Sequence, residues 1–346
     1  MHPGPPDAVA SSARDGATIA DAVLPGRLER LLSELREERV PALDGAPEGL
    51  GALVELSYAL RPHVHEGRVP TYGAIVAPPS IVVGDQPSFR DGPNVTLIPV
   101  GGLDVRFARR FADGMATFAV RLPDGISHIA CFGRDVSAEY DLVGLQTMLG
   151  GLVIQRHPGG QVRVFGPSGV VRWDGISWHH DPPLESWLLR LGAAADHLPI
   201  DAMRAVLRFA VHELGGRRIG STLIWRPVDP TPPDGRVEPL VHNVPLLRLG
   251  RPGEAAAIAH ALAQTDGAAV FDGDGGLRSI GLRLAPSSTA ETSVRAMSGM
   301  RHTSALRYSF DDRDCVVIVV SDAGPVTIMH AGDVITKLDP LDETIG

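Results

Sequence analysis

The sequence contains few of the residues on which several large protein classes depend. Of its 346 residues only two are cysteines, Cys131 and Cys315, which are too few for a disulfide framework or for a zinc site built from thiolates. It has a single lysine, Lys337, so it lacks both the P-loop that ends in lysine and the strand lysine of protein kinases. A nucleotide site in this chain must therefore rely on arginine, backbone amides and a metal ion.

Long hydrophobic runs and a basic charge balance are also absent. No stretch of about 18 uninterrupted apolar residues occurs, so we expect no transmembrane helix and no membrane contact. Residues 1–24 have no basic flank followed by an apolar stretch, and we expect a cytoplasmic protein. A net charge of −9 argues against broad binding to a phosphate backbone, and we expect no nucleic-acid partner.

Composition and periodicity divide the chain into two halves. Residues 1–25 are rich in Pro, Gly, Ala and Ser and have no hydrophobic period, which predicts a disordered tail. Residues 26–183 begin with two helical patterns and continue with short strands joined by hairpin turns, which predicts an α+β domain. A helical linker is expected over residues 184–199.

Residues 200–338 alternate strands with helices, and this order is typical of an α/β domain. The clearest helix is predicted over residues 203–214, where apolar side chains recur at helical spacing behind Asp201 as the expected cap. The continuous apolar run 316–320 indicates a strand that is buried on both faces. The second half is therefore predicted to contain a mixed sheet flanked by helices.

Several polar clusters are better explained by structure than by chemistry. Residues 271–276 (Phe-Asp-Gly-Asp-Gly-Gly) are similar to a calcium loop, but Arg283 stands where such a loop needs a glutamate, so we interpret them as a hairpin turn. Two histidine pairs match no recognised metal-site spacing, and we expect surface or hydrogen-bonded side chains at His63 with His65 and at His179 with His180. Neither a Gly-x-Ser-x-Gly elbow nor a His-Glu-x-x-His motif occurs.

Three segments of the second half carry groups suited to phosphate or metal. Asp266 offers a carboxylate, and the adjacent Gly267 allows close approach of the backbone to a ligand. Arg301 lies where a helix is expected to begin, so its guanidinium and the free amides can converge on phosphate. Ser321 and Asp322 follow the buried strand. Each segment alone also fits a turn, a cap or a surface charge, but together they supply what metal-assisted nucleotide chemistry requires.

In order and spacing these segments resemble the signatures of the diadenylate cyclase domain, the catalytic module of DNA-integrity-scanning proteins and of membrane-bound cyclic di-AMP synthases. The matching residues are Asp266-Gly267-Ala268, Gly299-Met300-Arg301-His302-Thr303 and Val320-Ser321-Asp322. Gly281 and Leu282 resemble the family's strand segment at the adenine pocket, and residues 207–225 resemble its helix and Gly-Ala-Leu strand. The resemblance covers residues 200–335.

The resemblance implies that the chain condenses two ATP molecules into cyclic di-AMP and releases two pyrophosphates. Because each 3′-hydroxyl must attack the α-phosphate of the other ATP, it implies a homodimer or higher oligomer with cyclase domains face to face. It implies catalytic roles for Asp266, Arg301 and His302, with Mg²⁺ or Mn²⁺ held by Asp266 and Asp322. The implied nucleotide-binding residues are Gly267, Ala268, Leu282, Gly299, Met300, Thr303, Ser321 and Asp322.

Two departures from the family pattern favour an alternative. Thr303 stands where many members have a second arginine, which Arg307 could replace one helical turn further on, and Asp322 is one methylene shorter than the usual glutamate. The alternative is a catalytically silent module that senses ATP or a cyclic dinucleotide, and a partner protein without a nucleotide site is a third hypothesis. No motif identifies the first half. Since cyclases of this family are often fused to regulatory modules, we expect a sensor domain there.

Overall fold

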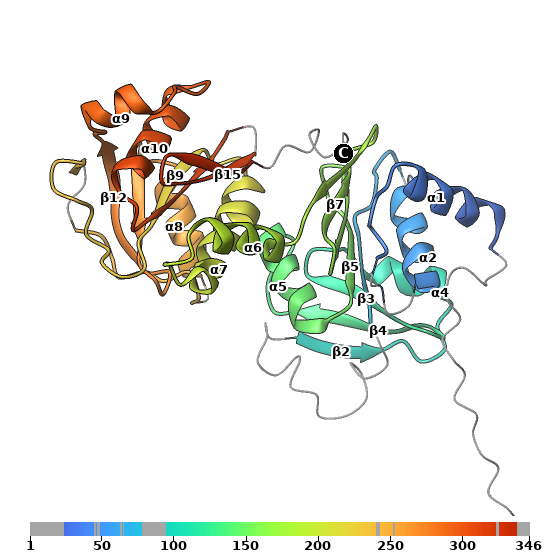
Figure 1. Ribbon diagram of the computed structural model, residues 1–346. Helices are drawn as coiled ribbons and strands as arrows, with labels where there is room; N and C mark the ends of the chain where they lie inside the picture. The colour runs from blue at the N-terminus through green and yellow to red at the C-terminus, as the bar shows by residue number, and fades with distance from the viewer. Residues whose placement is uncertain are drawn as a thin grey trace, which may run out of the picture.

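The chain folds around two β-sheets, one in each half of the sequence (Figure 1). The structure, a computed structural model, describes residues 24–44, 46, 49–62, 64, 66–77, 95–239, 243–251, 253–322 and 325–337. The predicted tail lies outside the described residues up to residue 23, and so do His63 and His65. We call the part up to residue 183 the first domain and the part from residue 184 onward the second domain.

The first domain is an α+β structure, as predicted. Its elements are α1 (Gly26–Glu37), α2 (Gly49–Leu60), β1 (Tyr72–Val76), β2 (Val95–Pro99), α4 (Val105–Ala108), η3 (Arg109–Phe111), β3 (Thr117–Leu122), β4 (Gly125–Phe132), α5 (Glu139–Leu149), β5 (Leu152–Arg156), β6 (Val162–Gly166), β7 (Gly169–Trp173) and β8 (Trp178–Asp181). The strand order is β2-β4-β3-β1-β5-β6-β7-β8. β1 and β3 run parallel, whereas the other described neighbours are antiparallel.

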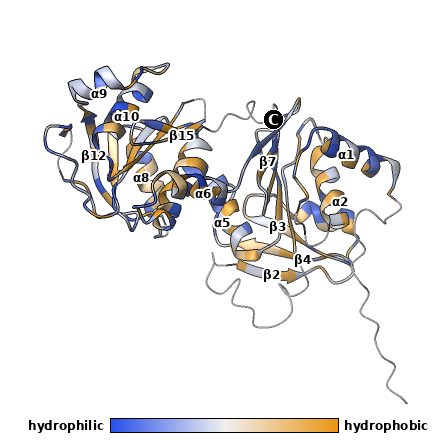
Figure 2. Ribbon diagram, viewed as in Figure 1, coloured by the Kyte–Doolittle hydropathy of each residue, from blue (hydrophilic) through white to orange (hydrophobic). Residues whose placement is uncertain are grey.

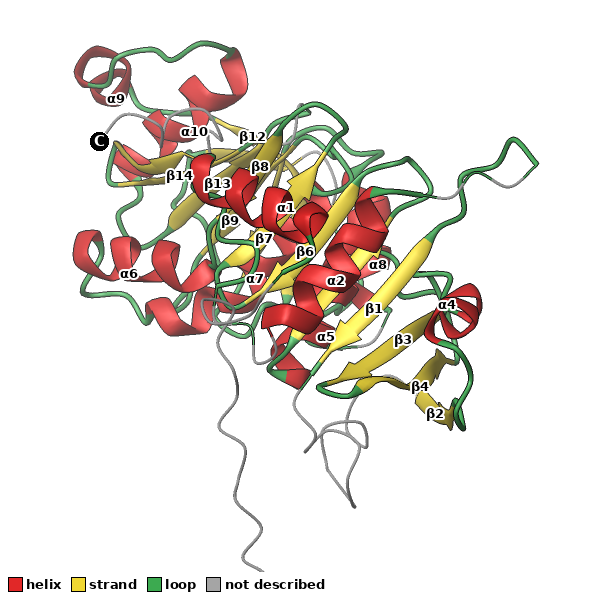
Figure 3. Cartoon of the chain, turned by 90° about the vertical axis from the view of Figure 1, so that its right-hand side faces the viewer, coloured by secondary structure: helices red, strands yellow, loops and turns green. Residues whose placement is uncertain are grey.

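Helices cover both faces of the first sheet. α1 buries Leu28, Leu31 and Leu35 at helical spacing, and α2 contacts β1, β5 and β6. Figure 3 shows both helices in front of the strands, and in Figure 2 α2 is largely orange whereas α1 alternates orange with blue. α5 covers the opposite face, where it contacts β5 and β6. This arrangement puts the first residue of α5, Glu139, at the side of the domain that meets the second domain.

The second domain is an α/β structure with a mixed sheet flanked by helices, also as predicted. Its elements are α6 (Leu184–Ala194), η4 (Ile200–Met203), α7 (Arg204–Arg208), η5 (Phe209–Gly215), β9 (Ser221–Trp225), β10 (Val237–Pro239), α8 (Glu254–Leu262), β11 (Ala268–Phe271), β12 (Leu277–Leu284), α9 (Ser288–Ser293), α10 (Met300–Asp311), β13 (Val316–Val320), β14 (Val326–His330) and β15 (Asp333–Lys337). The strand order is β10-β12-β11-β9-β13-β14-β15. β13 is buried at every residue, as its apolar run indicates.

The helix predicted over residues 203–214 is present, but it is not one regular α-helix. A 3₁₀ turn (η4) leads directly into α7, which continues as the π-helix η5 as far as Gly215. The prediction of Asp201 as a cap is wrong, because this residue lies inside the 3₁₀ turn and no side chain caps α7. The helical segment does not begin at residue 201, because the 3₁₀ turn already includes the hydrogen bond from the Ala202 amide to the Pro199 carbonyl at 2.9 Å and runs directly into α7.

The segment expected as a linker is helical where α6 forms, and its apolar face is buried. Leu184, Trp187 and Leu191 of α6 belong to the same hydrophobic core as Leu207 and Trp225 of the second domain. α6 therefore packs as part of that domain. In the described part of the chain no helix is both long enough and apolar enough to cross a lipid bilayer.

The calcium-like segment is a hairpin turn, as interpreted from the sequence. It joins β11 to β12, and the Asp272 carboxylate accepts hydrogen bonds from the amides of Asp274 and Gly276 at 2.9 and 2.7 Å. His179 contacts the Asp174 carboxylate at 3.0 Å, and His180 contacts the Ser168 carbonyl at 2.7 Å. These side chains thus have structural partners, as expected.

Candidate functional site

A cavity of about 420 Å³ lies at one edge of the second sheet, where the central strands β9, β11 and β13 begin or end. β9 and β11 are parallel neighbours, so the residues before them meet at the same edge. β13 runs antiparallel to β9 with Val320 opposite Ser221, which brings the residues after β13 to that edge too. The lining residues are Arg218, Ile219, Gly220, Leu262, Ala263, Gln264, Thr265, Asp266, Gly267, Arg301 and Asp322. The sheet topology therefore joins three segments that are distant in sequence.

The segment after α8 presents Asp266 and Gly267 to this cavity. The Thr265 hydroxyl donates to the Ala261 carbonyl at 2.9 Å and fixes the chain as it leaves the helix. Gly267 has a φ of +99°, and a Cβ atom there would lie 2.8 Å from the Leu282 carbonyl oxygen. Only glycine adopts this conformation without strain, and it leaves the Asp266 carboxylate exposed at the cavity.

Arg301 and Asp322 form an ion pair across the cavity. The Arg301 Nη1 atom lies 3.1 Å from the Asp322 Oδ1 atom, and the two side chains are 43% and 79% exposed. Such an exposed pair adds little to stability, so both charges can exchange partners with a ligand. Gly220 makes room for the pair, because a Cβ atom there would lie 1.6 Å from Asp322 Oδ1 and 2.6 Å from Arg301 Nη1.

The first turn of α10 is shaped by Thr303. Its hydroxyl lies 3.1 Å from the Met297 carbonyl and 3.0 Å from the Gly299 carbonyl, and it accepts from the Met297 amide at 3.0 Å. Gly299, just before the helix, has a φ of +98°. The Thr303 side chain thus holds the loop that leads into α10. Arg301, the second residue of this helix, lines the cavity.

The other end of α10 is anchored in the core of the domain. The Asp312 carboxylate accepts from Arg226 Nε of the β9 end at 2.9 Å and from the Tyr308 hydroxyl at 3.0 Å. Burial raises the pKa of Tyr308, so its hydroxyl remains a donor. This buried network fixes α10 relative to β9, and with it the position of Arg301 next to Gly220.

The structure brings four of the predicted site residues into the cavity lining, namely Asp266, Gly267, Arg301 and Asp322. The others lie around it. Ala268 and Leu282 are buried and face each other across β11 and β12, and Met300 is 90% exposed. The remaining predicted residues are outside the lining: Gly299, His302, Thr303 and Ser321. Arg307, considered as a substitute for the second arginine, donates to the Glu291 carbonyl at 3.3 Å.

Comparison with known proteins identifies both domains. Residues 208–334 match the family model DAC, described as the nucleotide-binding domain of the DisA bacterial checkpoint controller. The second domain belongs to the DAC family. Residues 30–181 match the family model DACNK, described as a probable sensor domain. No curated protein is similar enough to the chain to count as a match.

Two solved structures are similar to part of the chain. One is a hypothetical membrane spanning protein from Bacillus cereus, with 17% identity and a TM-score of 0.30 over 44% of this chain and 74% of that one. The other is DacA from Staphylococcus aureus, as a double mutant that carries two introduced cysteines, with 16% identity and a TM-score of 0.25 over 40% of this chain and 88% of that one.

The cavity lined by Asp266, Arg301 and Asp322 lies in the DAC domain, and we call it the DAC cavity. Its side chains suit a metal ion that binds together with phosphate. In the described part of the chain no group of three or more His, Cys, Asp or Glu side chains is arranged to hold a metal. The cavity has two carboxylates in its lining, Asp266 and Asp322. Mg²⁺ commonly binds one or two carboxylates and takes its other ligands from substrate phosphates and water. The residues present fit such an ion.

Among the residues of the DAC cavity that were not identified as site residues from the sequence, two shape the cavity. Arg218 lines the cavity with a φ of +56°, and Gly220 makes room for the Arg301–Asp322 pair. The only sequence signal for Arg218 is the pair of arginines after the glycines at 215 and 216. Its position depends on the π-helix η5, which apolar spacing does not distinguish from a regular helix.

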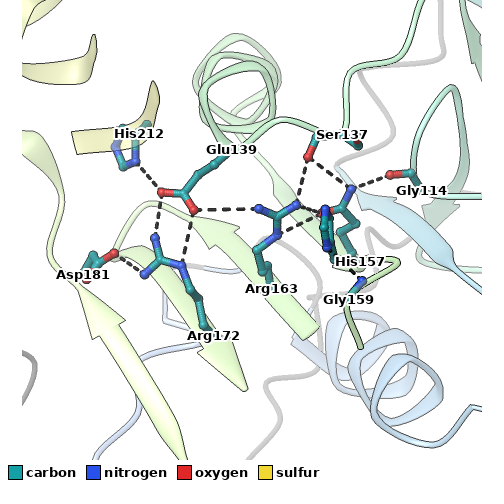
Figure 4. Close-up of polar contacts among 10 residues, drawn as sticks. Gly114, Ser137, Glu139, His157, Gly159, Arg163, Arg172, Asp181 and His212 are labelled. Carbon is teal, nitrogen blue, oxygen red and sulfur yellow. Dashed lines mark hydrogen bonds and ion pairs between the residues drawn. The ribbon is translucent and has the colours of Figure 1, made fainter. Parts of the chain in front are cut away.

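A buried ionic cluster between the DACNK and DAC domains also went unrecognised in the sequence (Figure 4). Glu139 of α5 binds Arg172 of β7 at 2.7 Å and His212 of η5 at 2.9 Å. Arg172 also pairs with Asp181, and Arg163 lies 3.9 Å from Glu139. Burial alone would raise the pKa of Glu139, but Arg172 and His212 outweigh it and lower this pKa to about 2. The carboxylate is therefore ionised and links the two domains.

Proposed function

We propose that the chain is a diadenylate cyclase that condenses two ATP molecules into cyclic di-AMP and releases two pyrophosphates. The observation that carries this proposal is that Asp266, Arg301 and Asp322, from three separate segments of a DAC domain, line one cavity. We assign the cyclase to residues 200–338 and the sensor to residues 26–183. Residues 184–199 connect them, and α6 within this connection packs against the cyclase.

Each half-reaction forms a bond from a 3′-oxygen to an α-phosphorus and breaks the bond from that phosphorus to pyrophosphate. The Arg301 guanidinium and the first amides of α10 would neutralise charge on the phosphates as it shifts to the leaving group. Gly267 would allow the triphosphate to approach the backbone. We assign His302 to orienting the phosphate or Arg301.

Asp266 and Asp322 would hold Mg²⁺ or Mn²⁺. When bound, such an ion lowers the pKa of the attacking hydroxyl and polarises the α-phosphate. In the structure Asp322 is paired with Arg301. We propose that triphosphate binding separates this pair, so that the guanidinium binds phosphate and the carboxylate becomes available to the cation.

One domain with one bound ATP cannot close the ring, so two DAC domains must face each other. The proposed active form is a homodimer or a higher oligomer in which each cavity supplies one ATP. The edge of the sheet that carries Gly220, Asp266 and Asp322 would then face the partner copy.

The proposal is tested by incubating the full-length protein with ATP and Mn²⁺ and measuring cyclic di-AMP and pyrophosphate by mass spectrometry. The expected result is both products in a ratio of one to two, with no product from Asp266→Asn. Asp274→Asn, an exposed carboxylate in the β11–β12 turn, is the matched control and should retain activity. A folded dimer that binds ATP but yields no product with any of several divalent metals would rule out the cyclase.

A second candidate is a catalytically silent DAC domain that senses ATP or a cyclic dinucleotide. The observation that favours it is the side chain of Thr303, which is bonded to the Met297 and Gly299 carbonyls and does not line the cavity. Calorimetry showing ATP binding without turnover would support this candidate. The double variant Thr303→Arg, Asp322→Glu should then gain measurable cyclase activity.

A further inference from the structure

A second cavity, of about 670 Å³, lies between the DACNK and DAC domains. The first domain lines it with α5 and the β6–β7 turn, and the second domain lines it with α6, α7 and the segment around Leu249. No residue of this lining also lines the cavity at Asp266. A volume of this size is typical of sites for small organic molecules, which often lie at domain interfaces.

Arg208, the last residue of α7, lines this cavity and stacks on an aromatic ring. Its guanidinium carbon lies 4.2 Å from the centroid of the Tyr140 ring on α5. The Nε atom is buried, and among the described residues no acceptor binds it. A buried donor on a charged group is costly unless an acceptor satisfies it. The protein encloses this atom, so the side chain offers its positive charge, and not the Nε donor, to the cavity at the boundary of the two domains.

The other charges around the cavity are already neutralised. Arg204, one helical turn before Arg208, pairs with Glu185 of α6. Asp141 lies beside Arg208 in a neighbouring cavity, but its two oxygens accept from Arg134 at 2.9 and 2.7 Å. Of the Asp, Glu and Arg side chains in the described lining, Arg208 is thus the one whose charge is not balanced by an ion pair.

The rest of the lining is suited to an apolar body. Val143 of α5, Phe165 and Val170 of the β6–β7 hairpin, and Leu184 of α6 contribute to it. Ligand sites commonly combine such a wall with a few polar groups that fix orientation. We infer that this cavity binds a small organic anion whose carboxylate or phosphate bonds to Arg208 while its apolar part contacts Phe165 and Val170.

The position of Arg208 connects this site to the DAC cavity along one continuous segment. η5 begins at the next residue, and His212 in it both lines the interdomain cavity and binds Glu139. The segment then turns at Arg218 and reaches Gly220, which line the DAC cavity. π-Helical turns are frequently found at functional sites. An anion at Arg208 therefore contacts the element that ends at the nucleotide site. We therefore expect the bound anion to change the cyclase rate, and this expectation rests on the proposed function. The binding of the anion does not depend on the proposed function.

The test measures binding of phenyl phosphate and phenylacetate to the full-length protein by calorimetry, without ATP, and uses uncharged phenylacetamide for comparison. Both anions should bind more tightly than the amide. Arg208→Met keeps the apolar stem and should weaken anion binding about tenfold or more, equivalent to about 1.4 kcal/mol. Arg204→Met, on the same helix and lining the same cavity, should change it less than about threefold.

Two further variants separate this site from the DAC cavity and from a folding defect. Asp266→Asn should leave phenyl phosphate affinity unchanged, even if the protein has no cyclase activity. Arg208→Lys keeps the charge but loses the planar guanidinium and should give an intermediate affinity. The inference is overturned if the anions bind no better than phenylacetamide, if Arg208→Lys and Arg208→Met both bind like the wild type, or if a soaked crystal shows phenyl phosphate only at Arg301.

Discussion

Two carboxylate–arginine pairs in this protein have opposite surroundings. Glu139 and Arg172 are 3% and 19% exposed between the domains, whereas Asp322 and Arg301 are 79% and 43% exposed at the DAC cavity. Removing one partner of a buried pair leaves an uncompensated charge, but an exposed pair contributes little to stability. The buried pair holds Glu139 ionised inside the DACNK domain, where it also contacts His212 of the DAC domain, whereas the exposed pair is suited to exchanging partners with a ligand.

The largest expected effect comes from breaking the buried pair. Glu139→Gln should lower the free energy of unfolding by about 3 kcal/mol, because it removes the buried charge that Arg172 and His212 both contact and leaves Arg172 with Asp181 alone. Asp141→Asn is the matched control on the same helix, since Asp141 pairs with the more exposed Arg134. It should cost less than about 1 kcal/mol. Urea denaturation measures both, and equal losses would show that the cluster does not stabilise the fold.

Lowering the pH should also remove the contribution of the Glu139 carboxylate to stability. The pKa of Glu139 is lowered from 4.5 to about 2 in the folded protein, so its stabilisation is complete above pH 4.5 and is lost as the pH falls toward 2. Over that range the wild type should lose about 3 kcal/mol more than Glu139→Gln does. Denaturation curves at several pH values test this. Parallel pH profiles for the two proteins would mean that the pKa of Glu139 is not lowered.

A smaller and more specific effect is expected at Gly220. In Gly220→Ala the added methyl group would displace both Asp322 and Arg301 from their places in the cavity, so Mn²⁺–ATP affinity should fall about tenfold. Gly192→Ala is the control, because a Cβ atom there meets nothing within 4 Å. Calorimetry compares the two variants. If Gly220→Ala binds ATP as the wild type does, the positions of Asp322 and Arg301 next to Gly220 do not matter to the ligand.

The smallest stability effect is expected from the exposed pair. Asp322→Asn should change the free energy of unfolding by less than about 1 kcal/mol, since the Arg301 guanidinium that loses its partner is exposed to water. Asp322→Asn should nevertheless weaken Mn²⁺–ATP binding. The two variants would then differ in kind, since Glu139→Gln lowers stability and Asp322→Asn lowers ligand affinity. A stability loss as large as that of Glu139→Gln would contradict the assignment of this pair to ligand binding.

Much of this organisation could be predicted from the sequence. The two fold classes follow from the order of helical and strand patterns. The grouping of Asp266, Arg301 and Asp322 is expected from the order and spacing of their segments and from the resemblance of these segments to the diadenylate cyclase signatures. The π-helix η5 could not be predicted, because apolar spacing over seven residues fits either helix type. Arg208 and Glu139 were missed for another reason. Their importance depends on contacts between domains, which no local pattern encodes.

The central claim is that Asp266 and Arg301 bind the same triphosphate, and a double-mutant cycle on Mn²⁺–ATP affinity tests it most directly. Calorimetry should show Asp266→Asn and Arg301→Met each weakening binding about tenfold or more, with a coupling energy above about 0.5 kcal/mol between them. Strictly additive losses, or an Arg301→Met variant that binds ATP as the wild type does, would contradict the claim.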